Sequence, residues 1–110
     1  MNKIVETAYK ALDNKKGINI KVIDISKVSV IADYFIIASG SNTKHVKALA
    51  DNVEDELGKL GYHAKQVEGY NTANWILLDY NDAIIHIFNE SDRLFYDLER
   101  IWRDGQLIEM

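Results

Sequence analysis

The feature that most constrains the fold of this chain is an apolar segment that runs directly into a turn and a long amphipathic helix. Residues 34–39, YFIIAS, are apolar on both faces, as expected for a central strand covered by helices on both sides. Gly40 and Ser41 follow, and residues 42–60 repeat apolar side chains at helical spacing. The sequence therefore predicts a strand, a sharp turn and a helix in succession, an arrangement shared by many phosphate-binding sites.

The segments before this unit predict one helix and one strand. Residues 3–15 place their apolar side chains on one helical stripe, and Gly17 supplies the stop. Residues 18–25, INIKVIDI, are rich in β-branched side chains, which favour a strand. Residues 26–32 predict only a short turn or a single helical turn.

The segments after this unit predict three strands and a last helix. Residues 62–69 alternate weakly and are polar, as in an edge strand. Residues 75–80 and 83–88 flank an Asn-Asp pair that tolerates a left-handed backbone, so they predict a β-hairpin. Asn89 or Ser91 caps the last helix. Its buried stripe is Leu94, Phe95, Leu98, Ile101 and Trp102.

The order of the predicted elements is α-β-β-α-β-β-β-α, in a single domain that spans residues 1–110. Because helices interrupt the strands rather than following each of them, we expect an α/β (α+β) fold. Its mixed sheet should have about five strands, flanked by helices on at least one face. With no cysteine, the chain must rely on its apolar core rather than on disulfides or a thiolate zinc site.

The charge balance argues against a nucleic-acid ligand. The chain has 17 acidic and 13 basic residues, a net charge of −4, and no basic cluster longer than Lys15–Lys16. Nucleic acid usually requires a basic face, so a basic protein surface is the more natural partner. The apolar runs are far too short for a membrane span, and the first residues do not resemble a signal peptide. We therefore expect a cytoplasmic protein.

The Gly40–Ser41 turn has two interpretations. In the first, Ser41 or Asn42 accepts a hydrogen bond from the first helical turn, and Gly40 lets the chain bend sharply. In the second, a phosphate binds the free backbone N–H groups with help from Lys44. No GxxxxGK[ST] motif is present, so the sequence favours the helix cap.

A strand followed by a Gly-Ser turn is also similar to the opening of the nucleotidyltransferase fold. Those enzymes then place two metal-binding carboxylates on a strand. Here the next acidic residues, Asp51 and Asp55 among them, lie inside the predicted helix and face solvent. The three histidines have no metal-ligand spacing, and no histidine is spaced to activate a serine. The sequence predicts no catalytic residue, no metal site and no cofactor.

The predicted hairpin has one unusual face. Strand alternation places Trp75, Leu77 and Asp79 on the same face as His86. The opposite face is nearly pure core; its residues are Ile76, Leu78, Tyr80, Ala83, Ile85 and Ile87. Either helices cover the mixed face and His86 is satisfied by Asp79 or a backbone group, or part of it is an open, acid-rimmed apolar patch. The residues alone leave both open.

Three segments together closely resemble the ribosomal silencing factor family, also called Iojap. They are DYFIIASGSNTKHVKALADNVEDEL, VEGYNTANWILLDYNDAIIHIF and SDRLFYDLERIW, and the resemblance runs from about residue 3 to residue 104. The resemblance implies a mixed α/β fold related to nucleotidyltransferases without their carboxylates. One departure is Asn81, where the family usually has glycine, so the turn should be slightly strained.

The resemblance further implies a function without catalysis. Family members bind the fourteenth protein of the large ribosomal subunit, block joining of the small subunit and so repress translation; several are homodimers when free. The residues carried over as partner-binding are Trp75, Leu77, Asp79, Tyr80 and Asp82, with Glu68 at the rim. Two alternatives stay open: a nucleotide-binding or nucleotidyltransferase enzyme that uses the Gly40–Ser41 turn, and a generic dimerisation module.

Overall fold

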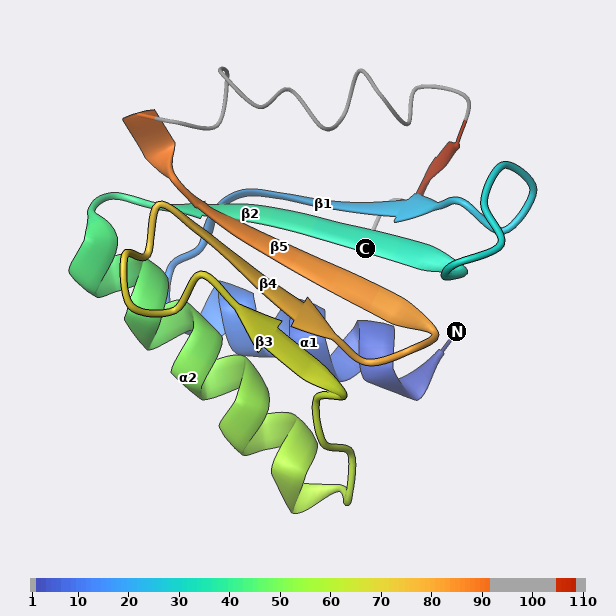
Figure 1. Cartoon of the computed structure of the whole chain (residues 1–110), viewed down its shortest axis with the longest axis horizontal. Helices are drawn as coiled ribbons and strands as arrows, with labels where there is room; N and C mark the ends of the chain where they lie inside the picture. Colours follow the sequence, from blue (N-terminus) through green and yellow to red (C-terminus); the bar gives the residue numbers. More distant parts are fainter. Residues whose placement is uncertain (1, 92–104, 109–110) are drawn as a thin grey trace.

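The computed structural model describes residues 2–91 and 105–108. Helices and strands alternate irregularly along this part of the chain, close to the predicted order (Figure 1). The elements are α1 (Lys3–Asn14), β1 (Ile18–Asp24), β2 (Tyr34–Gly40), α2 (Thr43–Lys59), β3 (Gln66–Glu68), β4 (Trp75–Asp79), β5 (Ala83–Asn89) and β6 (Gln106–Ile108). The last helix predicted from the sequence lies outside the described residues.

The strands form one mixed sheet of six strands in the order β3-β4-β5-β2-β1-β6. Only the β2–β5 pair among them is parallel, from Tyr34 opposite Ala83 to Gly40 opposite Asn89. The predicted central position of residues 34–39 is confirmed, because β2 lies between β5 and β1. Residues 62–69 were expected to form an edge strand, and β3 is indeed at one edge of the sheet.

The expected number of about five strands was one too few. The additional strand, β6, pairs antiparallel with β1, with Leu107 opposite Ile23. Its three residues carry no local strand signal that distinguishes them from a terminal tail. These residues form a strand because they pair with β1, which lies more than eighty positions earlier in the sequence.

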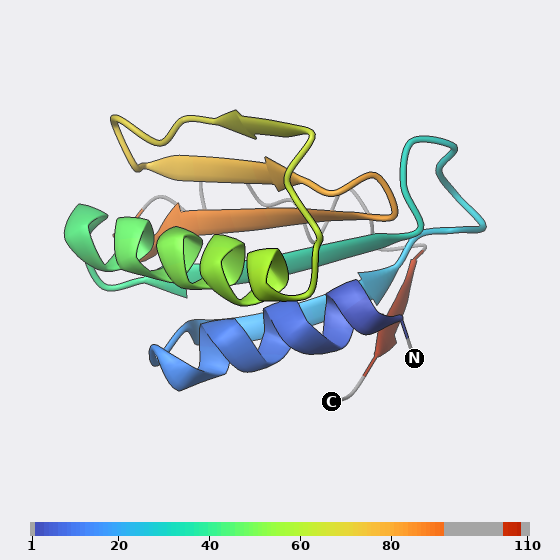
Figure 2. The same ribbon diagram turned by 90° about the horizontal axis from the view of Figure 1, so that it is seen from below.

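Helices α1 and α2 lie side by side on one face of the sheet (Figure 2). α1 begins where the side chain of Asn2 accepts hydrogen bonds from the backbone N–H groups of Ile4 and Val5, at 2.8 and 3.2 Å. Both helices turn their apolar stripes to the sheet and form the main core. Fully buried members include Val5, Leu12, Ile36, Val46, Leu49, Val53, Leu57, Ile76, Leu78, Ile85 and Ile87. No helix in the described part of the chain is long and apolar enough to cross a membrane.

A second apolar cluster lies on the other face of the sheet. Its buried members are Ile23, Ile25, Ala32, Phe35, Ile37, Ile84 and Phe88, and Trp75 and Leu77 pack against it while partly exposed. The central strands β2 and β5 are therefore buried on both faces. β4, one position nearer the edge, alternates between buried and half-buried residues.

The chain has no proline, and several of its turns use residues with a left-handed backbone. Asn81 has a φ of 68°, as the hairpin prediction requires, and its N–H donates to the Asp79 carboxylate at 2.9 Å. At the end of α1 the left-handed residue is Lys16, with a φ of 61°, rather than the predicted stop Gly17. Asn and Lys have side chains that make this conformation costlier than in glycine.

Gly40 is required by close packing between β2 and α2. A Cβ at this position would lie 2.8 Å from the backbone nitrogen of Val46 and 2.9 Å from its Cγ2. Gly40→Ala should therefore lower the free energy of unfolding by about 2 kcal/mol through overpacking. Chemical denaturation measures this loss.

Gly58, inside α2, is the matched control, because the nearest atom to a new Cβ there is His63 Cε1 at 4.0 Å. Gly58→Ala should raise the free energy of unfolding by up to about 1 kcal/mol, since alanine favours the helix. Equal effects of the two substitutions would contradict the packing explanation for Gly40.

Candidate functional site

The β4–β5 hairpin brings together the side chains that alternation assigned to its mixed face. Trp75 lies opposite Phe88, Leu77 opposite His86, and Asp79 opposite Ile84. This pairing confirms the predicted register. The mixed face and the second apolar cluster are the same side of the sheet, because Trp75 and Leu77 pack against that cluster.

Trp75 is held in place by contacts across the hairpin with His86 and Phe88. Its indole Nε1–H donates a hydrogen bond to His86 Nδ1 at 3.0 Å. Its ring stacks on Phe88 with centroids 5.2 Å apart and an interplanar angle of 29°. The indole is half-buried rather than sealed, and it lines a cavity of about 300 Å³ with Glu68, Gly69 and Leu77. Each of the two sequence interpretations therefore holds for one strand of this face: the side chains of β5 are buried, and those of β4 are partly exposed.

His86 is the buried polar group of this face, with only 4% of its surface exposed. The sequence analysis expected Asp79 or a backbone group as its partner, but the partner is the indole of Trp75. Because Nδ1 accepts that bond, the proton of the neutral ring lies on Nε2. Nε2 is buried and has no hydrogen-bond partner among the residues that the structure describes. Burial lowers the pKa of His86 to about 4, so the ring is neutral near pH 7.

The backbone of the loop between β3 and β4 passes close to Trp75, and a glycine makes this approach possible. Gly69 has a φ of +77°, and a Cβ there would overlap the carbonyl of Trp75. Tyr70 ties the loop to α2: its hydroxyl donates to the Asp51 carboxylate at 2.9 Å, and Lys47 Nζ lies 5.4 Å from its ring centre. The cavity beside Trp75 is therefore formed by a loop anchored on α2.

The residues predicted to contact a partner do not form one compact group. Glu68, Trp75 and Leu77 line one cavity at the start of β4. Asp79, at the end of β4, shares their face, and Asp82 is exposed in the following turn.

Tyr80 lies apart from the other predicted contact residues. It is only 5% exposed and belongs to the core beneath the helices, as strand alternation indicated. Burial raises its pKa to about 12, so its hydroxyl stays neutral. Its side chain supports the hairpin from the face opposite Trp75.

The Gly40–Ser41 turn is built as a helix entry. Asn42 is the N-cap of α2, and its side chain accepts a hydrogen bond from the His45 backbone N–H at 2.8 Å. The Ser41 N–H donates to His45 Nδ1, also at 2.8 Å. The space beside Gly40 is occupied by Val46. These contacts support the helix cap and leave the phosphate interpretation without a supporting observation.

One histidine does lie beside a serine, although the sequence analysis found no histidine spaced to activate one. Ser41 Oγ lies 3.2 Å from His45 Nδ1, and His45 Nε2 lies 2.8 Å from the Lys15 carbonyl. The spacing of four residues across the first turn of α2 was the signal that could have found this pair. The Nδ1 lone pair already accepts the shorter bond from the Ser41 N–H, so it is not free to remove the hydroxyl proton. The ring instead fastens the end of α1 to the start of α2.

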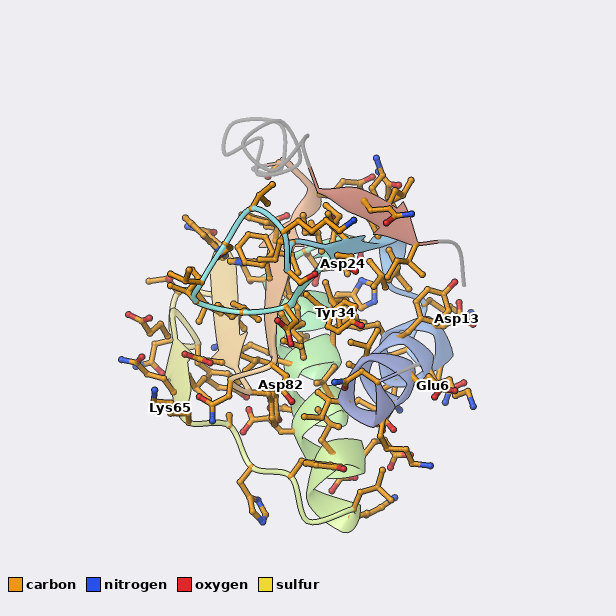
Figure 3. The ribbon with its side chains drawn as sticks, turned by 90° about the vertical axis from the view of Figure 1, so that its right-hand side faces the viewer. Glu6, Asp13, Asp24, Tyr34, Lys65 and Asp82 are labelled. Carbon is orange, nitrogen blue, oxygen red and sulfur yellow. The ribbon has the colours of Figure 1, made fainter. Side chains whose placement is uncertain are left out.

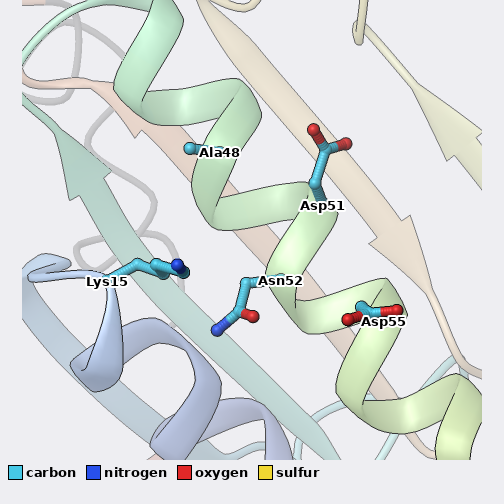
Figure 4. A pocket seen from close by; sticks show the side chains of 5 residues that line it. All are labelled: Lys15, Ala48, Asp51, Asn52 and Asp55. Atoms are coloured by element: carbon cyan, nitrogen blue, oxygen red, sulfur yellow. The ribbon is translucent and has the colours of Figure 1, made fainter.

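A cavity of about 400 Å³ lies between the C-terminal end of α1 and one side of α2 (Figure 4). Its lining residues are Lys15 at the end of α1 and Ala48, Asp51, Asn52 and Asp55 on α2. Asp51 and Asp55 are exposed on α2, as the sequence analysis expected, but no cavity beside them was predicted. Asn52 donates to the Ala11 carbonyl at 2.8 Å, and Asp51 accepts from Tyr70. Within residues 2–91 and 105–108, no group of three or more potential ligands could hold a metal ion.

The buried His86 predicts a specific dependence of stability on pH. Its pKa is about 4 in the folded chain against 6.5 ordinarily, so the unfolded chain binds this proton first as the pH falls. The free energy of unfolding should drop by about 3 kcal/mol on this account between pH 6.5 and pH 4. His86→Gln should flatten the dependence across that range in urea titrations, whereas replacement of the exposed His63 by Gln should not. An unchanged slope in His86→Gln would contradict a neutral, buried imidazole.

Comparison with known proteins identifies the family. The model of the family described as "Ribosomal silencing factor during starvation" matches residues 1–110. The chain is 35% identical to ribosomal silencing factor RsfS of Bacillus subtilis over 107 residues, which covers 97% of this chain and 91% of that protein. It is 39% identical to RsfS of Haemophilus influenzae over 99 residues, covering 90% of this chain and 97% of that protein.

The fold agrees with a solved relative. A crystal structure of a protein from Chromobacterium violaceum superposes with a TM-score of 0.90 at 32% identity, covering 100% of this chain and 92% of that one. The resemblance inferred from the three sequence segments is thereby confirmed. This chain belongs to the RsfS/Iojap family of ribosomal silencing factors.

Proposed function

We propose that this protein binds the large ribosomal subunit through that subunit's fourteenth protein and sterically prevents the small subunit from joining. The family to which it belongs consists of ribosome regulators rather than enzymes. The observation that supports a contact surface on this chain is the half-buried Trp75, which is fixed by His86 and Phe88 beside an apolar cavity with an acidic rim. A rigid aromatic side chain of this kind is the usual anchor of a protein interface.

The charge of this surface favours protein over ribosomal RNA. Glu68, opposite Leu77 on the neighbouring strand, and Asp82, in the turn after β4, are exposed, and the chain as a whole carries a net charge of −4. RNA phosphates would be repelled, whereas a basic ribosomal protein would be attracted. The same carboxylates would discourage docking elsewhere on the subunit.

In this proposal the contact residues follow β4 from end to end. Trp75 and Leu77 contribute the apolar part, and Glu68, Asp79 and Asp82 contribute the charged part. From Trp75 to Asp79 the strand extends roughly 13 Å, a length that fits within an ordinary protein interface. Tyr80 acts indirectly, because its buried ring holds the end of the strand in position.

The proposed action is mechanical occlusion in the cytoplasm by a single domain, without cofactor or turnover. We further propose that the free protein is a homodimer. If the dimer uses the same hairpin, self-association and ribosome binding compete for one surface, and each weakens the other by mass action.

Trp75→Ala should weaken binding to the large subunit by about 2 kcal/mol or more, which is roughly 30-fold. Because the indole also packs on Phe88, the variant should lose stability, so binding must be measured where circular dichroism shows it folded. Tyr62→Ala, at an exposed aromatic residue on another part of the surface, is the control and should bind normally. Unchanged inhibition of subunit joining by folded Trp75→Ala would remove Trp75 from the interface.

Asp82→Lys should weaken binding about tenfold and reduce the association rate, because a cation then faces the basic partner. Asp55→Lys is a matched control: it makes the same charge change at an exposed position on α2. Surface plasmon resonance on immobilised large subunits, repeated at several salt concentrations, compares the two. Equal losses would show that only net charge matters and would argue against the β4 surface.

A further inference from the structure

The connection between β1 and β2 exposes branched aliphatic side chains where loops usually carry polar ones. Val30 is fully exposed, Ile31 is 64% exposed and Val28 is 42% exposed. Single exposed apolar residues are normal on a protein surface, but three within four positions form a contiguous apolar tip. Figure 1 shows this loop projecting beyond the end of the sheet.

The loop is held in a defined conformation rather than left free in solvent. The Val28 and Ser29 N–H groups donate to the Ile25 carbonyl at 3.0 and 2.9 Å, and the Ile31 N–H donates to Ser29 Oγ at 3.1 Å. At the base of the loop, Ile25 N–H donates to the Asp33 carbonyl at 2.8 Å. An ordered loop loses little conformational entropy on binding, so its exposed tip is suited to recognition.

The loop is also fastened to the β4–β5 turn. The N–H groups of Asp33 and Tyr34 both donate to the Asp82 carbonyl, at 2.9 and 3.0 Å. Figure 3 looks onto this end of the sheet, with the loop toward the viewer and Asp82 below it. The two segments together line a cavity of about 210 Å³, formed by Val30, Ile31, Ala32, Asp33, Asn81 and Asp82.

The chemistry of this cavity matches one kind of side chain. Both charged residues that line it, Asp33 and Asp82, are acidic and exposed, and neither carboxylate has an ion-pair or hydrogen-bond partner within residues 2–91 and 105–108. A lysine or arginine could place its charged end between the carboxylates and its aliphatic stem against Val30 and Ile31. A phosphate group would be repelled by the same carboxylates.

We propose that Val30, Ile31 and Asp33 form a second contact site, which receives a lysine or arginine side chain of the same basic ribosomal protein that β4 binds. This inference rests on the proposed function, because the occupant is the partner proposed there. The site extends the interface past Asp82 to the loop at the end of the sheet. The apolar tip supplies buried area, and Asp33 supplies a charge-assisted hydrogen bond.

The test is co-sedimentation of the full chain with purified bacterial large subunits at several salt concentrations. The double variant Val30→Ser/Ile31→Ser should bind about tenfold more weakly than the wild-type chain. Asp33→Asn should bind more weakly and with a shallower dependence on salt, because one charge pair is lost. Leu60→Ser, at a residue 48% exposed at the C-cap of α2, is the control and should bind as the wild-type chain does. Thermal unfolding checks that every variant is folded.

The outcomes separate this proposal from the one on which it rests. If the wild-type chain binds and the double variant binds equally well, the second contact site is wrong and the β4 surface stands. If the wild-type chain does not travel with large subunits at all, the proposed function itself fails. If the double variant loses only self-association, measured by sedimentation equilibrium, the occupant is a second copy of this chain and the proposal is overturned.

Discussion

The parallel pairing of β2 with β5 is the interaction on which the rest of the structure depends. The two strands are nearly fifty residues apart in the sequence, yet they pair in register from Tyr34 opposite Ala83 to Gly40 opposite Asn89. Parallel strands cannot be joined by a tight turn, so α2, β3 and β4 must fill the connection. The pairing thus places α2 on one face and leaves β4 beside β5, on the far side from β2.

The same arrangement creates a gradient of burial across the sheet. β5 is buried on both faces, while β4, next to the short edge strand β3, keeps three of its five residues partly exposed. Trp75 sits at this boundary, with its N–H and one ring face directed to buried partners on β5. A side chain in this position is rigid and still reachable, which is the combination that an interface anchor requires.

Much of this architecture could be predicted because it follows from local patterns in the sequence. Helical spacing gave both described helices, strand alternation gave the two faces of the hairpin, and the Asn-Asp pair gave its turn. Alternation also placed Tyr80 in the core, whereas the family resemblance carried it over as a contact residue; its burial agrees with alternation. The partner-binding roles of Trp75, Leu77, Asp79, Asp82 and Glu68 remain predictions.

The sequence by itself determined helices α1 and α2, strands β1 to β5, the family and the side of each hairpin strand that faces the core. These follow from the spacing of apolar side chains and from recognisable segments. Only the tertiary structure decided that β6 joins the sheet, that His86 is paired with Trp75, that His45 joins Ser41 to Lys15, and that the 26–33 loop lies against the β4–β5 turn. The contacts of β6 with β1, of His45 with Lys15, and of the 26–33 loop with the β4–β5 turn join residues far apart along the chain. The Trp75–His86 and Ser41–His45 contacts depend on side-chain rotamers. No pattern of neighbouring residues in the sequence specifies a distant contact or a rotamer.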